Sequence, residues 1–299
     1  MGSGASRGWA HIGVIEALEE AGIHPDFMAG TSIGAYVGAV CAADGLQRIK
    51  DFALDMDWKK VIAYVDLVFP RSGFLDGRKV TDMLPELMQV EAFEELKIPF
   101  AVVATDMKNG EEVVFKSGKI TPAVRASISV PGILIPVHYQ DRWLIDGGVV
   151  NPLPVDVVRG MGADIVIAVD LNSEKISAKD REESKAQDDI NQFLEKNSSA
   201  LLKNLKKQYG TAGKKISQKI DAWFSTEEKA PRVIEVTSRA LYILERSVTK
   251  ANLKLHKPDI LIQPKLGHLD MFDFHEAASA IKEGNKSTQQ VLSKLKDML

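Results

Sequence analysis

Cysteine is nearly absent from this chain, since Cys41 is the only one among 299 residues. A single cysteine cannot form an internal disulfide, so a disulfide framework is excluded and a reducing compartment is expected. No charge sign dominates either, because 38 Lys and Arg stand against 41 Asp and Glu, for a net charge of −3. The near balance, with no basic stretch interleaved with aromatic residues, argues against a nucleic-acid partner.

Long hydrophobic runs are also missing. No apolar stretch reaches the ~18–20 residues that a membrane-spanning helix needs. The N-terminus reaches Gly2 without a charged and then apolar signal segment. These absences favour a cytoplasmic protein and leave open a peripheral contact at the inner membrane surface. The apolar fraction of 45% is ample for a core, so disorder is excluded as the main state.

Strand and helix patterns alternate along the first part of the chain. Short apolar, β-rich runs predict strands at Asp26–Thr31, Ile98–Thr105, Trp143–Asp146 and Asp164–Asp170. Helical patterns occupy Trp9–Ala21, which Gly22 would end, and Ile33–Ala43. This alternation predicts an α/β layered fold whose mainly parallel sheet is covered on both faces.

A charged stretch from about residue 172 to about residue 230 separates this part from the rest. We interpret it as a helical insertion that packs on the body, and a lid or membrane-surface helix is the alternative. After it, the predicted elements are a helix at Val233–Leu253, a strand at Asp259–Pro264 and a closing helix at Asp273–Lys296 capped by Asp273. Residues 1–299 are therefore predicted to form a single domain with this insertion.

The segment Gly30-Thr31-Ser32-Ile33-Gly34 has the Gly-x-Ser-x-Gly form between a predicted strand and a predicted helix. Such a turn exposes its serine in a strained conformation, and its flanking glycines suit a crowded backbone where no Cβ fits. The start of the helix directs N–H groups toward an anion beside the serine. The pattern predicts a nucleophile at Ser32, whereas a glycine-rich turn before a buried helix is the structural alternative.

A nucleophilic serine needs a base, and the sequence offers two kinds. Among six histidines, His256, His268 and His275 occupy the place that a Ser–Asp–His chain order would give one. The other candidate is Asp146, which ends a predicted strand before Gly147 and Gly148. Parallel sheets build sites at the carboxyl ends of strands, but an Asp-Gly turn is also common. The residues alone leave both bases open.

The N-terminal run Gly2–Gly8 is rich in glycine and leads into a predicted helix. Unpaired N–H groups in such a loop can hold an anion. One interpretation is a dinucleotide-binding loop, but Arg7 occupies its third glycine position and no acidic ribose ligand follows at the expected distance. The other is an oxyanion hole that stabilises charge developing on a carbonyl oxygen.

Taken together, these stretches resemble the patatin-like phospholipase family, in its bacterial branch related to neuropathy target esterase. The resemblance is carried by Gly2–Gly13 (GSGASRGWAHIG), Gly30–Gly34 (GTSIG) and Asp146–Pro154 (DGGVVNPLP), and supported by Ala104–Asp106, Gly110–Glu112, Ala123–Pro136, Pro258–Pro264 and Leu269–His275. It covers nearly the whole chain outside the insertion, and it implies a three-layer α/β sandwich with a mainly parallel central sheet.

The resemblance also implies a function, that of a serine acyl hydrolase acting on lipid esters through a Ser–Asp dyad. Ser32 would be the nucleophile and Asp146 the proton acceptor. The oxyanion N–H groups would come from Gly2, Ser3, Gly4 and Ala5, in a loop that Arg7 would hold. No metal or cofactor is implied, and the expected partner is a lipid or other ester substrate. Val130–Pro136 is the predicted lining for an acyl chain.

Two features depart from the family pattern. Ser3 stands where the loop usually has its first glycine, counted back from Gly8, and only Met1 occupies the place of the strand that usually precedes the loop. We therefore expect that the chain is truncated or that its natural start lies upstream. The missing strand favours one alternative, a weakly active or inactive regulatory or scaffold protein on the same fold. A Ser–His–Asp hydrolase is the second alternative, and a nucleotide-binding protein is the most distant.

Overall fold

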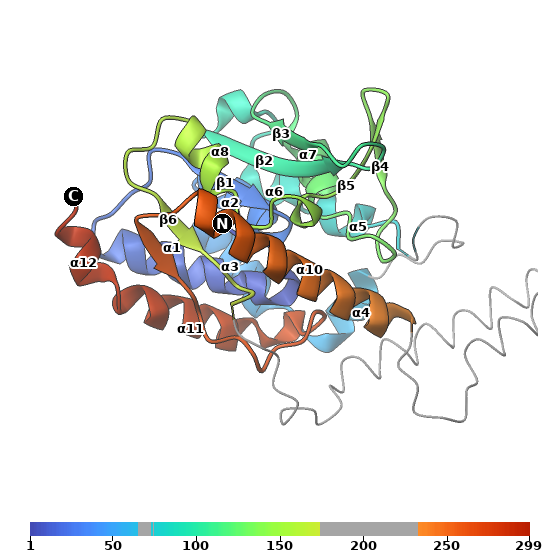
Figure 1. Cartoon of the computed structure of the whole chain (residues 1–299). Helices are drawn as coiled ribbons and strands as arrows, with labels where there is room; N and C mark the ends of the chain where they lie inside the picture. The colour runs from blue at the N-terminus through green and yellow to red at the C-terminus, as the bar shows by residue number, and fades with distance from the viewer. Residues whose placement is uncertain (65–72, 74, 174–232) are drawn as a thin grey trace, which may run out of the picture.

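The computed structural model describes residues 1–64, 73, 75–173 and 233–299, arranged as a central sheet between two layers of helices (Figure 1). The three-layer α/β sandwich predicted from the sequence is confirmed. The predicted insertion at about 172–230 lies outside the described residues except for its first two, so its interpretation stays a prediction.

The elements follow the expected order. The strands are β1 (Met28–Thr31), β2 (Phe100–Asp106), β3 (Glu112–Phe115), β4 (Val137–Tyr139), β5 (Arg142–Asp146), β6 (Ile167–Val169) and β7 (Ile260–Ile262). The α-helices are α1 (Ala10–Glu20), α2 (Ile33–Ala42), α3 (Leu46–Leu54), α4 (Trp58–Tyr64), α5 (Arg78–Thr81), α6 (Leu84–Met88), α7 (Ile120–Ser127), α8 (Val155–Gly160), α10 (Val233–Leu255), α11 (Ala277–Gln289) and α12 (Leu292–Lys296). Short 3-10 turns are η1 (Ala5–Trp9), η2 (Phe93–Glu95), η3 (Gly147–Val149) and η4 (Phe274–Glu276). The five predicted strands are present as β1, β2, β5, β6 and β7, whereas β3 and β4 were not predicted.

Parallel pairing forms the middle of the sheet. β1 pairs with β2 in parallel, and β6 pairs with β7 in parallel. Met1 joins the two pairs, because its nitrogen donates to Ala29 O while the N–H of Thr31 donates to Met1 O. On the other side, the N–H of Gly2 donates to Val169 O at 3.0 Å. The backbone of Met1 and Gly2 therefore lies between β1 and β6.

Antiparallel strands extend the sheet beyond β2. β3 pairs with β2 over its residues Val102–Thr105, while β5 pairs with β2 at Ala104–Asp106 and with β4 on its other edge. The overlap means that β3 occupies one edge of β2, so β1 and β5 share the opposite edge. The carboxyl ends of β1 and β5 consequently meet.

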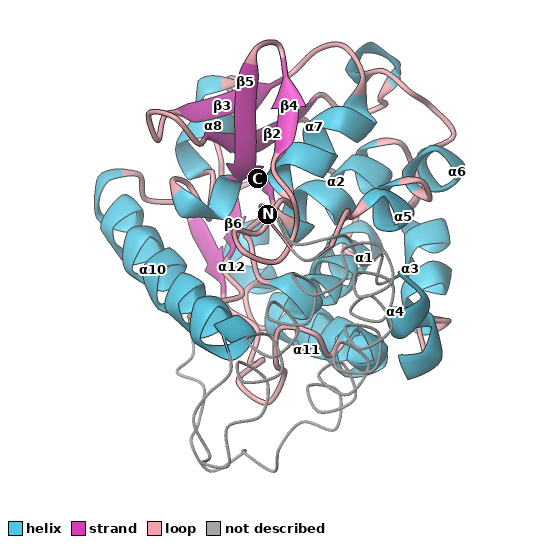
Figure 2. Ribbon diagram, turned by 90° about the vertical axis from the view of Figure 1, so that its right-hand side faces the viewer, coloured by secondary structure: helices cyan, strands magenta, loops and turns pink. Residues whose placement is uncertain are grey.

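Alternate residues of the central strands face the two helical layers. Met28, Phe100 and Val102 pack into the large core cluster with α1 and α2, whereas Ala29 and Ala101 pack with residues of α8 on the other face. Figure 2 shows α8 and α10 on one side of the sheet and α2 and α7 on the other. Both faces are buried, as the nearly continuous apolar runs predicted.

The C-terminal helix differs from its prediction. Asp273–Lys296 is not one helix but η4, α11 and α12. Asp273 precedes η4 without a capping bond from its side chain to that turn, and Asp273 Oδ2 instead accepts the N–H of Asp270 at 2.7 Å. A single helix was therefore the wrong prediction, because the periodicity of apolar residues does not show where the helical hydrogen-bond pattern is interrupted.

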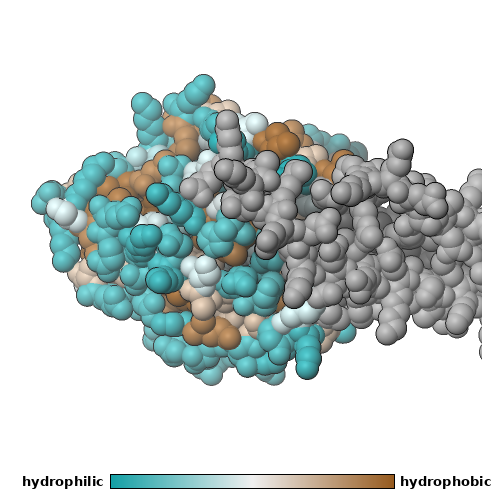
Figure 3. All heavy atoms as spheres, turned by 90° about the horizontal axis from the view of Figure 1, so that it is seen from below, coloured by the Kyte–Doolittle hydropathy of each residue, from teal (hydrophilic) through white to brown (hydrophobic). Residues whose placement is uncertain are grey.

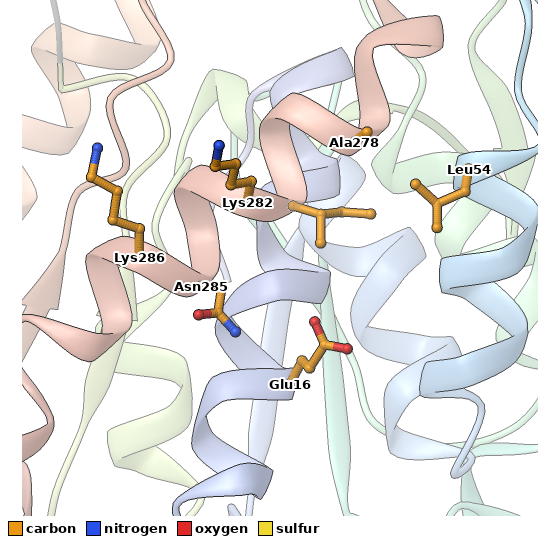
Figure 4. Close-up of a pocket in the computed structure, with 7 residues that line it drawn as sticks. Glu16, Leu54, Ala278, Lys282, Asn285 and Lys286 are labelled. Carbon is orange, nitrogen blue, oxygen red and sulfur yellow. The ribbon is translucent and has the colours of Figure 1, made fainter.

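Helices α1 and α11 lie side by side along the lower part of the molecule (Figure 1). With α3 they border an open surface hollow of about 470 Å³, lined by Glu16, Leu54, Ala278, Ile281, Lys282, Asn285 and Lys286 (Figure 4). None of these residues is a predicted site residue. Seen from below, the described surface is mainly hydrophilic with small hydrophobic patches (Figure 3).

Candidate active site

The register of the sheet brings Ser32 and Asp146 together. Thr31 at the end of β1 lies opposite Val103, and Asp146 at the end of β5 lies opposite Ala104, the next residue of β2. Ser32 follows Thr31 directly, so the two strand ends abut with these side chains between them. Ser32 Oγ donates a hydrogen bond of 2.6 Å to Asp146 Oδ2.

Ser32 has the strained backbone that the turn predicts, with φ 57° and ψ −125°. The glycines around it are required by crowding. A Cβ at Gly30 would lie 2.3 Å from Gly34 O, and one at Gly34 would lie 2.5 Å from Met1 O. Any side chain at either position would overlap backbone atoms, so the turn and the N-terminal loop pack without side chains between them.

Ser127 and Ser129 hold the dyad from α7 and from the residues after it. The N–H of Ser32 donates to Ser127 Oγ at 2.8 Å, and that hydroxyl donates to Val103 O at 2.6 Å. The N–H of Asp146 donates to Ser129 O at 3.0 Å. Neither Ser127 nor Ser129 was predicted to belong to the site, because spacing along the sequence does not show which serine faces the turn.

Asp146 is 2% exposed, and its second oxygen, Oδ1, accepts the N–H of Gly148 at 2.7 Å. Burial, followed by the nearby charge of Glu245, raises the pKa of Asp146 to about 8. The bonds from Ser32 and Gly148 oppose that rise. A carboxylate with a raised pKa binds a proton more tightly, which makes it a better proton acceptor.

The N-terminal loop lies against the serine turn, since a Cβ at Gly8 would overlap the side chain of Ile33. Its N–H groups are not equivalent. Those of Gly2 and Ser3 already donate to Val169 O and Pro152 O at 3.0 and 2.8 Å. Two of the four N–H groups that were expected to face an oxyanion are therefore already bonded to backbone carbonyls. Among the described residues, the N–H groups of Gly4 and Ala5 have no hydrogen-bond acceptor.

Arg7 and His11 anchor this loop. Arg7 is buried, and its guanidinium donates to Leu269 O at 2.7 and 3.1 Å and to Asn172 Oδ1 at 3.3 Å. The ring of His11 meets Gly2 O through Nε2 at 2.8 Å. Burial lowers the pKa of His11 to about 3, so the ring is neutral and Nε2–H is the donor.

All six histidines lie in the described part of the chain, and none forms a hydrogen bond with Ser32 or Asp146. Of the three named for a triad, His268 bonds to Ser279 Oγ and His275 packs against Trp58. His256 is exposed at the end of α10. The geometry thus pairs Ser32 with a carboxylate.

The described residues offer neither a cluster of metal ligands nor a membrane-spanning helix. No three His, Cys, Asp or Glu side chains among them are placed to hold a metal ion. No helix in residues 1–64, 75–173 or 233–299 combines the length and apolar character needed to cross a bilayer.

Comparison with known proteins gives the geometry a family context. Residues 1–159 match the family model described as patatin-like phospholipase. An uncharacterized NTE family protein of Mycobacterium bovis is 30% identical over 98% of this chain and 90% of its own length. The human patatin-like phospholipase domain-containing protein 6 is 37% identical over 58% of this chain, which spans 13% of that protein. Lysophospholipase nte1 of Aspergillus fumigatus is 35% identical over 58% of this chain and 12% of its own length.

Proposed function

The chain belongs to the patatin-like phospholipase family, and from that premise we propose that it is a serine acyl hydrolase of lipid esters with Ser32 as nucleophile and Asp146 as base. Membership implies lipid hydrolase activity at the level of the family. The observation that carries the proposal for this chain is the 2.6 Å hydrogen bond between Ser32 Oγ and Asp146 Oδ2.

In the acylation step, Ser32 Oγ attacks the ester carbonyl carbon while its proton passes to Asp146 Oδ2. The buried site favours this transfer because it disfavours the charged carboxylate relative to the neutral acid. Asp146 then gives the proton to the departing alcohol oxygen. The carbonyl carbon stays bound to Ser32 as an acyl-enzyme.

The negative charge on the former carbonyl oxygen needs donors that are already oriented. The N–H groups of Gly4 and Ala5, which have no acceptor in the part of the chain that the structure describes, are our candidates, since the loop that carries them packs on the serine turn. In deacylation, Asp146 takes a proton from water, the hydroxide oxygen attacks the acyl carbon, and Ser32 leaves with the proton returned to it. This proposal assigns no step to a metal or cofactor.

The substrate that fits this chemistry is a lipid ester. One relative is named a lysophospholipase, which makes a lysophospholipid a suitable first substrate to assay. Val130–Pro136 remains the proposed lining for the acyl chain, because it follows directly on Ser129, whose carbonyl holds Asp146. Ile133 is buried in this run and most of its other residues are half-buried.

The test is covalent labelling of the purified chain with a fluorophosphonate, read by intact mass, beside hydrolysis of a lysophospholipid. Ser32→Ala should abolish labelling and lower turnover by at least about 10³-fold. Asp146→Asn should slow both, because the serine loses its proton acceptor. A folded wild-type chain that neither labels nor hydrolyses the lipid would favour a scaffold role instead.

The histidines provide the matched control for the choice of base. Single changes His256→Ala, His268→Ala and His275→Ala should each keep labelling within about twofold of wild type, since none bonds to the dyad. Loss of labelling in one of these folded variants would point to a Ser–His–Asp triad.

A further inference from the structure

A second carboxyl group lies beside the dyad, on α10. Glu245 Oε2 accepts a hydrogen bond from Ser3 Oγ at 2.7 Å and another from Asn172 Nδ2 at 3.1 Å. Its other oxygen lies against Gly148, because a Cβ there would be 2.6 Å from Glu245 Oε1 and 3.0 Å from Asp146 Oδ1. The Glu245 side chain thus contacts both the N-terminal loop, through Ser3, and the turn after Asp146, at Gly148.

The charged and titratable groups around Glu245 come from several elements. Asp146 faces it from β5, and Arg7 faces it from η1. On α10 itself, the ring of Tyr242 lies 4.8 Å under the Arg7 guanidinium, and Asp270 and Arg239 also act on Arg7. The positive charge of Arg7 lowers the pKa of Glu245, against the effect of burial. The Arg7 guanidinium donates its hydrogen bonds to Leu269 O and Asn172 Oδ1 rather than to the Glu245 carboxylate.

Asn172 completes the network. Its amide bridges Arg7 and Glu245, and its Nδ2 also donates to Ser3 O at 3.3 Å. Asn172 and Glu245 both lie beyond residues 1–159, the part that the family model matches. The side chains that hold Ser3 therefore come from the chain beyond the residues that the family model matches.

We propose that Glu245 is a positioning residue for acyl transfer, holding Ser3 so that the next two N–H groups, of Gly4 and Ala5, keep a fixed place beside Ser32. This role rests on the proposed function of Ser32 and Asp146. The hydrogen bond to Ser3 supplies the clamp, and the charge of Glu245 acts separately on Asp146. The two contributions can be removed one at a time.

Each contribution predicts a different change. A loop freed from the clamp shifts its N–H donors, and a displacement of about 1 Å at a reacting centre can cost about 100-fold in rate. The charge of Glu245 is the second cause of the raised pKa of Asp146, after burial. Removing the charge lowers the pKa of Asp146, so Asp146 is deprotonated at lower pH. The acid limb of the pH–rate profile therefore shifts to lower pH.

The experiment measures the second-order rate of fluorophosphonate labelling at Ser32 as a function of pH. Glu245→Gln keeps an acceptor for Ser3 but loses the charge, whereas Glu245→Ala loses both. Ser3→Ala loses the clamp and keeps the charge. Lys250→Gln, on the exposed face of α10, is the control for altering a charge on this helix, and circular dichroism checks that each variant is folded.

Glu245→Ala and Ser3→Ala should label at least about tenfold more slowly than wild type, with Glu245→Gln recovering most of the rate. Glu245→Gln should also shift the acid limb of the rate profile to lower pH, further than Ser3→Ala does. If Glu245→Ala does not fold, Ser3→Ala and Glu245→Gln alone test the positioning role and the effect of the charge. Ser3→Ala at the wild-type rate overturns the positioning role, and an acid limb unmoved in Glu245→Gln overturns the separate effect of the Glu245 charge on Asp146. No labelling of the folded wild type at any pH overturns the proposed function, and the positioning role falls with it.

Discussion

Ser32 and Asp146 both occupy conformations or environments that oppose folding. Ser32 has a positive φ that non-glycine residues rarely adopt, and Asp146 is a carboxyl group removed from water. Such strain persists only where the surroundings over-determine it, here through Ser127, Ser129 and Gly148. At the residue scale, holding Ser32 and Asp146 in this arrangement therefore costs stability, and under the proposed function the two groups would serve as an oriented nucleophile and a strong proton acceptor.

The raised pKa of Asp146 predicts how stability depends on pH. The folded form holds this proton up to about pH 8, whereas the unfolded form releases it near its ordinary value of 3.8. The tighter proton binding of Asp146 in the folded state therefore contributes to the free energy of unfolding in full below pH 3.8. This contribution is lost as the pH rises from 3.8 to about 8. The asparagine in Asp146→Asn cannot ionise. The melting temperature of this variant, relative to that of wild type, should therefore increase across this pH window, by at least about 2 °C above pH 8.

Thermal melts of both proteins between pH 4 and pH 9 test this prediction. Glu283→Gln on α11 is the control, because it removes a carboxylate that pairs with Lys286 and is not a cause of the raised pKa of Asp146. A melting-temperature difference between Asp146→Asn and wild type that stays constant over the whole range would contradict the raised pKa.

Helices α1 and α11 meet at backbone distance. A Cβ at Gly13 in α1 would lie 1.9 Å from Ile281 O, and one at Gly284 in α11 would lie 2.0 Å from Ala10 O. Glycine inside a helix costs about 0.5–1 kcal/mol relative to alanine. The close packing of the two helices offsets that cost and supports η1 and the loop in front of α1.

A matched pair of glycine variants tests this contact. Gly13→Ala should destabilise the protein by about 1–3 kcal/mol or more, because the added methyl overlaps a carbonyl and forces the helices apart. Gly160→Ala, at the end of α8, adds a methyl where the described residues place no atom within 4 Å apart from its own helix and chain neighbours, so it should be nearly neutral. Chemical denaturation measures both, and equal effects would mean that the α1–α11 contact adapts freely.

At the scale of the whole molecule, the N-terminal loop is tied to segments from across the chain. Gly2 and Ser3 donate to Val169 O and Pro152 O, while Ser6 and Arg7 bond to Met271 O and Leu269 O. The N-terminal half matched by the family model thus depends on the C-terminal part to hold its loop. The site should form only when both parts are folded together.

This dependence predicts that the site and the fold are lost at one temperature. The fraction of chain that labels rapidly with a fluorophosphonate should fall along the same curve as the helical circular dichroism signal. Labelling that disappears well below the main unfolding transition would show instead that the loop opens by itself.

Local features of the sequence already predicted much of this protein. The glycine spacing around Ser32 predicted a crowded turn, and a Cβ at Gly30 or Gly34 would indeed overlap the backbone. Apolar runs predicted the strands with both faces covered, and α1, α2 and α10 lie close to their predicted ranges. These features depend on neighbours within a few residues, which is why the sequence by itself determined them.

Tertiary structure decided what depends on distant residues. The register of β1 and β5 on β2 places Asp146, rather than a histidine, beside Ser32. Gly2 and Ser3 pair with Val169 and Pro152, so that, among the described residues, only the N–H groups of Gly4 and Ala5 in Gly2–Ala5 are left without an acceptor. Glu245 meets Ser3 across 242 positions of sequence. No local pattern encodes such contacts, because register and helix docking are set by how buried surfaces fit once the layers pack together.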